Sequence, residues 1–517
     1  MTDHQFMRGT LILFATSIIL KILGFFYQIV TIRLIGTEPV GILNMAYPFY
    51  IAFVVLATAG IPLAIAKLIA EQRSRQDMAS IRRTMKLAFC IVFLLSGCFL
   101  LLSIILMPMV FGHLHSDPRM VWCYYMLLPG IVIVPISSII RGYFQGLQQM
   151  VYPSLGQIAE QLVRLTTGIG LIVLLKPYGV RFIAVGLAGG MMAGELAGML
   201  LIAVFYRHSI KKWPKPVSSD RRAVGRLLKE IMALGIPTTL TRLTSTLDMA
   251  FEASLIPFCL LQMGYDQSQA TSIYGQVSGV ALTLLTIPMV LTGALATSLV
   301  PAISKASAAH HRQEMAALCS EAIRLTYIFS LPIIIVLFCY GGALTQILFH
   351  IGQLGPLLRI LTLGAIFLYV GQTTVGIMQG LGQTQAVFIN NLLGAVAKLV
   401  CIYFFVAQRH QGTSGIALAF VLGYIAQCLL NLLSILKEVS LRLSAAQVLL
   451  PLANGVFMLL LLPPLRKGLA MLLGPTLGLL CAIVAGGLIY FALLVLTRQF
   501  RLDLRQLLPH SRTKQNA

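Results

Sequence analysis

Long apolar runs separated by short polar segments recur along the whole chain. A membrane-spanning helix needs roughly 20 consecutive, mostly apolar residues, and many of these runs reach that length. Dividing the chain at its polar segments predicts about fourteen spans, near 9–32, 40–66, 87–111, 120–140, 154–175, 182–206, 231–257, 273–300, 325–348, 357–378, 386–407, 415–436, 445–465 and 470–497. The pattern therefore predicts an all-α polytopic membrane protein.

Short polar motifs within this pattern occur twice. "FQGLQQ" at 144–149 returns as "MQGLGQ" at 378–383, and "AIAK" at 64–67 returns as "AISK" at 302–305. Each pair holds the same place in the order of spans, so spans one to six correspond to spans seven to twelve. Because six is an even number, both halves enter the membrane from the same side, which predicts a parallel repeat. The QGL motifs themselves predict a turn at the end of the fourth span of each half.

The repeat divides the chain into two six-helix lobes and a C-terminal helix pair without a partner. We expect an N-lobe at 1–208, a basic linker at 209–230, a C-lobe at 231–440, the helix pair at 441–500 and a tail at 501–517.

Composition and charge agree with a protein that lies in a membrane. The chain has 10 % charged and 58 % hydrophobic residues and a mean hydropathy of +0.88, whereas soluble proteins have about 25 % charged residues. The net charge of +22 would suit a nucleic-acid partner, but 26 of the 38 Lys and Arg residues lie in segments on one side of the spans and eight on the other. The positive-inside rule then predicts a cytoplasmic membrane protein with both termini cytoplasmic. The basic segments are expected to attract anionic lipids rather than nucleic acid.

Three segments resemble a known family. They are "LILFATSIILKILGFFYQIVTIRLIG" in the first span, "GIPLAIAKLIAE" at the end of the second and "RGYFQGLQQ" at the end of the fourth. With the 6+6+2 order of spans, they resemble the MOP exporter superfamily and its polysaccharide-transport branch, within it the stage V sporulation protein B group, which is related to MurJ-like lipid II flippases. The resemblance implies a MATE/MurJ-like V of two lobes, a central cavity that alternates between the two faces, and a polyprenyl-linked saccharide as cargo. It also implies that the C-terminal helix pair forms a groove for the lipid tail.

Eight ionisable residues lie inside the predicted spans, where a charge costs about 2.5–3.5 kcal/mol to insert and is a functional candidate by default. The basic ones are Lys21, Arg164, Arg242 and Lys398, and the acidic ones are Glu160, Glu195, Asp248 and Glu252.

Two of the cations hold matching places in the two halves. Aligning Ser17 with Thr238 also aligns Lys21 with Arg242, in the first span of each half. We expect these two to bind one pyrophosphate between the lobes, since a guanidinium offers phosphate a bidentate fork and an ammonium a point charge. The alternative is a salt bridge from either cation to a neighbouring helix.

The other two cations are further candidates for binding substrate. Glu160 lies one helical turn before Arg164, so these two side chains can neutralise each other, and a structural role is equally open. Lys398 has no acidic residue within a turn and either snorkels or lines the cavity.

The acidic residues divide into a pair and two single positions. Asp248 and Glu252 lie one turn apart, which suits a coupling site for H⁺ or Na⁺; alternatively, one of them pairs with Arg242 or Lys21 across the lobes. Glu195, whose role stays open, lies beside a stripe of small residues that predicts close helix packing. The stripe consists of Gly186, Gly190, Gly194 and Gly198.

Motifs of known catalytic sites are absent from the sequence. It contains no Walker loop, GxSxG or HExxH, and the nine cysteines are expected to be core residues rather than metal ligands. We therefore expect neither enzyme activity nor a cofactor or metal. The function favoured is a flippase that moves a polyprenyl-pyrophosphate-linked saccharide, such as lipid II or a related cell-wall precursor, for peptidoglycan or spore-wall synthesis. The alternatives are an H⁺- or Na⁺-coupled multidrug or organic-cation antiporter, in which Asp248 and Glu252 are the central acids, and a non-transporting scaffold for envelope assembly. Protein partners stay open.

Overall fold

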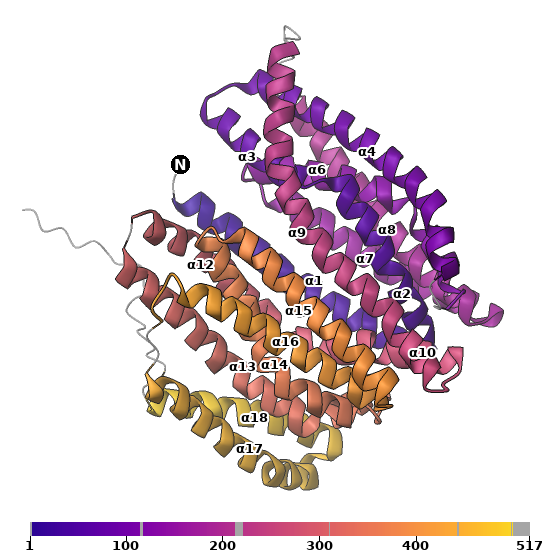
Figure 1. The fold of residues 1–517 in the computed structure, drawn as a ribbon, viewed down its shortest axis with the longest axis vertical. Helices are drawn as coiled ribbons and strands as arrows, with labels where there is room; N and C mark the ends of the chain where they lie inside the picture. Colours follow the sequence, from indigo (N-terminus) through magenta and orange to yellow (C-terminus); the bar gives the residue numbers. More distant parts are fainter. Residues whose placement is uncertain are drawn as a thin grey trace, which may run out of the picture.

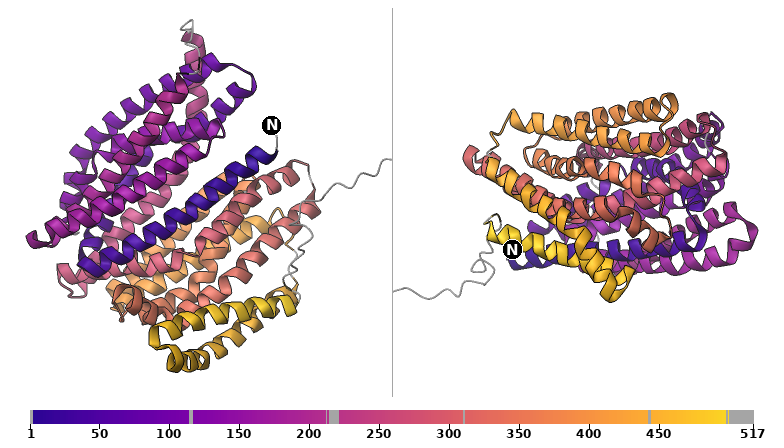
Figure 2. Two further views of the ribbon diagram at one scale, coloured as in Figure 1. Left: turned by 180° about the vertical axis from the view of Figure 1, so that it is seen from behind. Right: turned by 90° about the horizontal axis from the view of Figure 1, so that it is seen from below.

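The computed structural model describes residues 3–113, 117–211, 213, 221–309, 311–441, 444–497 and 499. Within these ranges the chain folds into helices and contains no strand (Figure 1). The helices form two bundles, and a smaller helix pair packs against the outside of the second bundle (Figures 1 and 2). This arrangement confirms the all-α membrane fold with two lobes and a C-terminal helix pair. The expected tail at 501–517 lies outside the described residues.

The N-lobe consists of the first eight helices. Their bounds are α1 (Asp3–Ile35), α2 (Glu38–Thr58), α3 (Ile61–Ser74), α4 (Met78–His113), α5 (Met120–Leu127), α6 (Gly130–Gly146), α7 (Val151–Leu175) and α8 (Val180–Ile210). Two of its spans are broken. α2 and α3 are separated by Ala59 and Gly60, which have φ angles of 47° and 62°, and α5 meets α6 at an angle of 42°.

The C-lobe and the helix pair follow. The C-lobe contains α9 (Arg221–Gln262), α10 (Gln267–Gln276), α11 (Leu282–Thr286), α12 (Met289–Ala308), α13 (Arg312–Phe349), α14 (Gly355–Gly380), α15 (Thr384–Ile402) and α16 (Gly412–Leu436), with π-helical turns at Val277–Ala281 and Tyr403–Gln408. The pair is α17 (Ala445–Leu473) and α18 (Pro475–Leu496), and both helices contact α13.

The number of spans is close to the expected fourteen. Among the described residues, twelve helices are long and apolar enough to cross a membrane, and the bent pair α5–α6 makes a thirteenth. The expected eighth span, 273–300, is divided among α10, a π-helical turn, α11 and α12. The expected linker is shorter than 209–230, because α9 begins at Arg221 and continues into the seventh span without a break.

The first helix of each lobe also touches the other lobe. α1 packs on α7 of its own lobe and contacts α12 and α13 of the C-lobe. α9 packs on α15 of its own lobe and contacts α2, α3 and α4 of the N-lobe. Because α12–α13 and α2–α4 hold the second and third spans of their lobes, the two sets of contacts are equivalent. This equivalence is what a two-fold relation between the lobes requires.

The repeated QGL motifs form the same helix-ending turn in both lobes. In the first copy, the amide of Gln149 donates to the carbonyl of Phe144 at 2.9 Å, and Gln148 has a φ of 57°. In the second copy, 234 residues later, Gln383 donates to Met378 at 2.9 Å and Gly382 has a φ of 78°. A left-handed residue followed by a long-range amide bond is the Schellman pattern that ends helices. The motif is therefore repeated because each lobe ends its fourth span in this way.

Candidate functional site

The two lobes are in close contact where α2 and α10 cross, and α9 also packs along α2 and α3. Beyond these contacts the lobes diverge towards the end at which α1 begins (Figures 1 and 2). We call the contact of α2 with α10 the junction and define it by Thr37 and Gly41 of α2 and by Thr271 and Gly275 of α10. A methyl group on Gly41 would clash with the carbonyl oxygen of Thr271, and one on Gly275 would clash with that of Thr37. Both residues of α10 lie 234 positions after their counterparts in α2, so the contact is reciprocal, as at a two-fold axis.

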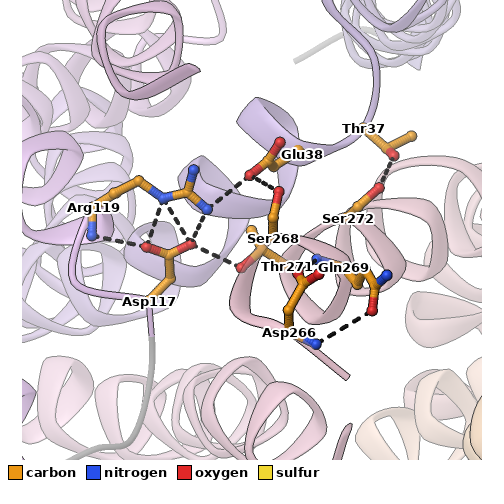
Figure 3. A network of polar contacts seen from close by, with 9 residues as sticks. All are labelled: Thr37, Glu38, Asp117, Arg119, Asp266, Ser268, Gln269, Thr271 and Ser272. Atoms are coloured by element: carbon orange, nitrogen blue, oxygen red, sulfur yellow. Dashed lines mark hydrogen bonds and ion pairs between the residues drawn. The ribbon is translucent and has the colours of Figure 1, made fainter. Parts of the chain in front are cut away.

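A polar network ties the lobes together beside the junction (Figure 3). The fully buried carboxylate of Asp117 accepts hydrogen bonds from Arg119 at 2.7 Å and from the hydroxyl of Thr271 at 2.9 Å. Arg119 also pairs with Glu38 at 2.8 Å, and Glu38 accepts a hydrogen bond from Ser268 of the C-lobe. The hydrogen bonds that Arg119 donates to Asp117, then the charge of Asp117 and the hydrogen bond to Glu38, raise the pKa of Arg119 above its usual value. The cation therefore stays charged at any physiological pH.

Further hydrogen bonds cross between the lobes near the junction; among them, Arg33 of α1 donates to the carbonyl of Leu348 in α13 at 2.7 Å. The hydroxyls of Thr37 and Ser272 are 2.8 Å apart (Figure 3). The amide of Asn44 donates to the hydroxyl of Ser278 at 3.0 Å, and the amide of Gln28 donates to the carbonyl of Gly279 at 2.7 Å. Close backbone packing and these hydrogen bonds hold this end of the molecule closed, and the ion pairs within the N-lobe position the carboxylates of Asp117 and Glu38 that accept from the C-lobe.

The N-lobe contains a cluster of partly buried charges between α7 and α8. Arg164 bonds Glu160 at 2.7 Å and Glu195 at 3.2 Å, and Arg141 of α6 lies 3.6 Å from Glu160. Glu160 neutralises Arg164, as expected from their spacing. Glu195, whose role was left open, also forms an ion pair with Arg164. The two arginines and two glutamates balance one another, so the cluster brings no net charge into the lobe.

The C-lobe contains a second cluster, between α9 and α15. The ammonium of Lys398 bonds Asp248 at 2.7 Å and also pairs with Glu252, and Lys398 is only 8 % exposed. The two carboxylates thus pair with neither Arg242 nor Lys21, although such a pairing was one of the alternatives drawn from the sequence. They pair instead with Lys398 of the same lobe, 150 residues after Asp248. Lys398 does line a pocket, of about 180 Å³. It does not snorkel, because its charge is already satisfied inside the lobe.

Arg164 and Lys398 hold equivalent positions in the two lobes. They are separated by 234 residues, the offset of the QGL motifs, and lie in the fifth and eleventh spans. Each also faces a glycine of the next helix: a methyl group on Gly194 would lie 2.9 Å from the Cβ of Arg164, and one on Gly423 would lie 2.7 Å from the Cβ of Lys398. Each lobe therefore has a cation of its own at this equivalent position.

The glycine stripe of α8 packs directly on α7. A methyl group on Gly190 would lie 2.5 Å from the Cα of Gly168, and one on Gly194 would lie 2.6 Å from the carbonyl oxygen of Glu160. Gly198 and Gly186 are nearly as close to side chains of the same helix, at 2.9 and 3.1 Å. The two helix backbones approach one another because these positions lack side chains.

Lys21 and Arg242 differ from the other intramembrane cations. Lys21 is half-buried and Arg242 is exposed, and neither forms an ion pair within the described part of the chain. Lys21 precedes Gln28 by seven residues, which is two helical turns, and Gln28 reaches the C-lobe. Arg242 follows Gly235 by the same seven residues, and a methyl group on Gly235 would clash with the backbone of Ala59 in the N-lobe. Each cation thus lies on the face of its helix that is turned to the opposite lobe.

Comparisons with known proteins agree with this architecture. Residues 6–307 match the polysaccharide biosynthesis protein family. This chain belongs to that family. Over 507 residues it is 29 % identical to the stage V sporulation protein B of Bacillus subtilis (strain 168), covering 97 % of both chains. It is 21 % identical to the lipid II flippase MurJ of the same organism, covering 84 % of this chain and 83 % of that one.

Solved structures show the same fold in relatives of this family. An inward closed conformation of the lipid II flippase MurJ matches 94 % of this chain and 99 % of its own with a TM-score of 0.69 at 17 % identity. An inward-facing multidrug resistance MATE transporter of the MOP superfamily matches 81 % of this chain and 94 % of its own with a TM-score of 0.68 at 16 % identity. These structures confirm the MATE/MurJ-like fold that the resemblance implied, and the relatives support a multi-pass membrane protein.

The junction was not predicted from the sequence. One signal for it was present: "TEPVG" at 37–41 and "TSIYG" at 271–275 share their threonine and glycine at the repeat offset of 234. Asp117 and Arg119 carried no such signal, because their partners come from distant parts of the chain and the pair lies in a short connection before α5.

Proposed function

We propose that this protein moves a polyprenyl-pyrophosphate-linked saccharide across the cytoplasmic membrane by alternating access. The observation that carries the proposal is the contrast between two kinds of intramembrane cation. Arg164 and Lys398 are neutralised by carboxylates of their own lobes. Lys21 and Arg242 are not, and both are turned to the opposite lobe.

An unpaired cation in a membrane protein has to be compensated. Insertion of each cation costs about 2.5–3.5 kcal/mol, and an anionic cargo between the lobes would offset this cost for both Lys21 and Arg242. A pyrophosphate suits the pair, because the guanidinium can bind two oxygens while the ammonium binds a third. The lipid II flippase among the relatives acts on a lipid-linked cargo of this class, which supports the proposal.

The positive-inside rule relates this architecture to the membrane. It places the end at which α1 begins in the cytoplasm and the junction on the outer side. The lobes diverge towards the cytoplasm, so cargo would enter from there and leave after the junction opens. The basic cytoplasmic segments would hold the protein against anionic lipid headgroups.

A cation-coupled antiporter is the second candidate, and Asp248 and Glu252 are the residues that favour it. Their charges are shared with Lys398, so an organic cation would have to displace a bonded ammonium. We therefore assign these two carboxylates to coupling, in which H⁺ or Na⁺ competes with Lys398, rather than to cargo binding. A scaffold without transport activity gives no reason for Lys21 and Arg242 to stay unpaired.

The test is lipid flipping by full-length protein reconstituted into liposomes with fluorescent lipid II. The double variant Lys21→Gln and Arg242→Gln is expected to lose at least roughly 100-fold in rate, because each of the two charge-assisted contacts contributes about 1.5–3 kcal/mol. The matched control, Arg409→Gln with Lys467→Gln, removes two cations outside the interface and should retain the wild-type rate. Equal rates in the wild type and the first variant would refute the proposed roles of Lys21 and Arg242.

A further inference from the structure

We infer that a pocket in the N-lobe binds the saccharide part of the cargo; this inference rests on the proposed function and deepens it. The pocket has a volume of about 310 Å³ and lies between α1, α2, α7 and α8. Ligand pockets in proteins span roughly 300–1,000 Å³, so this one suits a short saccharide and not a long polymer. Its polar lining consists of Tyr27, Gln28, Thr31, Asn44, Tyr47, Gln161 and Arg164.

The lining favours an uncharged, hydrogen-bonding ligand. It contains one cation and, among the described residues, no carboxylate; Glu160 and Glu195 bond Arg164 without lining the pocket. A metal ion or an organic cation would therefore meet no anionic ligand. Amide and hydroxyl side chains both donate and accept hydrogen bonds, so the complementary ligand carries many hydroxyl or acetamido groups. A saccharide has this chemistry.

Three polar atoms of the lining residues lack a hydrogen-bond partner of ordinary geometry among the described residues. They are the buried hydroxyls of Tyr27 and Thr31 and the buried Nε of Arg164. The two hydroxyls are near enough to interact with each other, and Thr31 is only 3 % exposed. Buried polar groups are nearly always paired, because an unpaired group has lost its bonds to water without replacement. A ligand that carries hydroxyl groups would supply the missing partners.

The position of the pocket fits a saccharide that follows a pyrophosphate. Lys21 precedes Gln28 by seven residues on α1, or roughly 10 Å along the helix. A cargo whose pyrophosphate contacts Lys21 would thus place the attached sugar at the pocket. Gln28 and Asn44 are also the amides that bond the C-lobe beside the junction. A bound saccharide would compete for these amides and so favour opening of the junction.

The C-lobe lacks an equally suitable pocket among those described. Its pocket beside Lys398 has a volume of about 180 Å³ and contains Asp248, one member of the buried ion pairs. The positions that match Tyr27 and Thr31, at the offset of 221 that aligns Lys21 with Arg242, are Asp248 and Glu252. The N-lobe therefore has hydroxyls where the C-lobe has carboxylates that Lys398 already occupies, and the N-lobe pocket suits a sugar better.

The first experiment measures saccharide binding directly. Full-length protein in a detergent without sugar groups is titrated with N,N′-diacetylchitobiose and observed by saturation-transfer NMR. We expect transfer to the sugar for the wild type and roughly tenfold weaker binding for Tyr27→Phe with Thr31→Val, which removes two hydroxyls. Since neither hydroxyl has a partner of ordinary geometry among the described residues, the variant should keep its melting temperature. Tyr124→Phe is the matched control, because that hydroxyl is also buried without a partner but does not line the pocket.

A second probe separates this inference from the proposed function. Undecaprenyl pyrophosphate without a sugar should bind equally well to the wild type and to the Tyr27→Phe, Thr31→Val variant. Absent or undiminished saccharide transfer would overturn the pocket assignment, even where the lipid pyrophosphate binds. If the saccharide binds as expected and the lipid pyrophosphate does not, the pocket assignment is supported and the proposed cargo is refuted.

Discussion

Replacing Gly41 with alanine adds one methyl group at the point where the backbones of α2 and α10 cross. That methyl would overlap the carbonyl oxygen of Thr271 and lie 3.1 Å from its carbon and 3.2 Å from the nitrogen of Gly275. Ordinary carbon contacts need about 3.5–4.0 Å, so the two helices have to move apart by roughly 1 Å. Overpacking of this kind costs about 1–3 kcal/mol, and this cost falls on the closed junction alone. The population of the closed state relative to an open one should therefore fall by about 5- to 150-fold.

The reciprocal geometry makes a second, sharper expectation. Gly275→Ala should have the same effect as Gly41→Ala, because its methyl would meet Thr37 in the mirrored contact. The double variant should not be twice as severe, since one separation of the helices relieves both overlaps and neighbouring sites are not additive. Two fully additive effects would contradict the single crossing point described above.

Disulfide cross-linking across the junction measures the closed population. Thr37→Cys and Ser272→Cys replace hydroxyls that are 2.8 Å apart, so the two thiols are within bonding reach when the junction is closed. The exposed cysteines are first replaced by alanine; these are Cys90, Cys98 and Cys481. Gly41→Ala should slow cross-linking, whereas Gly97→Ala, which has open space around it, should leave the rate unchanged. An unchanged rate in Gly41→Ala would refute the reasoning.

Three further predictions concern the interiors of the lobes. Lys398→Met should lower the free energy of unfolding by about 3–5 kcal/mol, measured by thermal unfolding, because it leaves two carboxylates unpaired inside the lobe. Adding Asp248→Asn and Glu252→Gln should restore much of this loss. No recovery in the triple variant would contradict this explanation. Gly194→Ala should destabilise the protein by about 1–3 kcal/mol, because the added methyl group overlaps α7. Gly170→Ala is the control and should be neutral, because no atom lies near that position. Similar melting temperatures for the two variants would argue against close α7–α8 packing. Spin labels on α9 and α15 should keep their distance while Lys398 bonds Asp248 and Glu252. The distance should increase when H⁺ or Na⁺ displaces the ammonium, and an unchanged distance at low pH and in Na⁺ would argue against coupling at this cluster.

The sequence predicted features that depend on local spacing and on repetition. The spans and the parallel repeat followed from apolar run length and motif order, and the pair of Glu160 with Arg164 followed from a separation of one turn. The bonds of Lys398 with Asp248 and Glu252 were not predictable, because α15 meets α9 only after the lobe has folded. The breaks at Ala59 and within 277–288 were also missed, because hydropathy reports how apolar a segment is and not whether its helix is continuous.

Differences between the equivalent clusters give the two lobes different mechanical properties. Arg164 takes its carboxylates from α7 and α8, the fifth and sixth spans of its lobe. Lys398 takes both of its own from α9, the first helix of its lobe. In α1, the matching positions are Tyr27 and Thr31, whose hydroxyls have no partner of ordinary geometry among the described residues. α9 is thus fixed to the C-lobe by charge, while no described side chain of α1 forms an ion pair with the N-lobe. A cargo that bonds the free groups of α1 would add the attachment that this helix lacks, and cargo binding would thereby act on a helix that contacts both lobes.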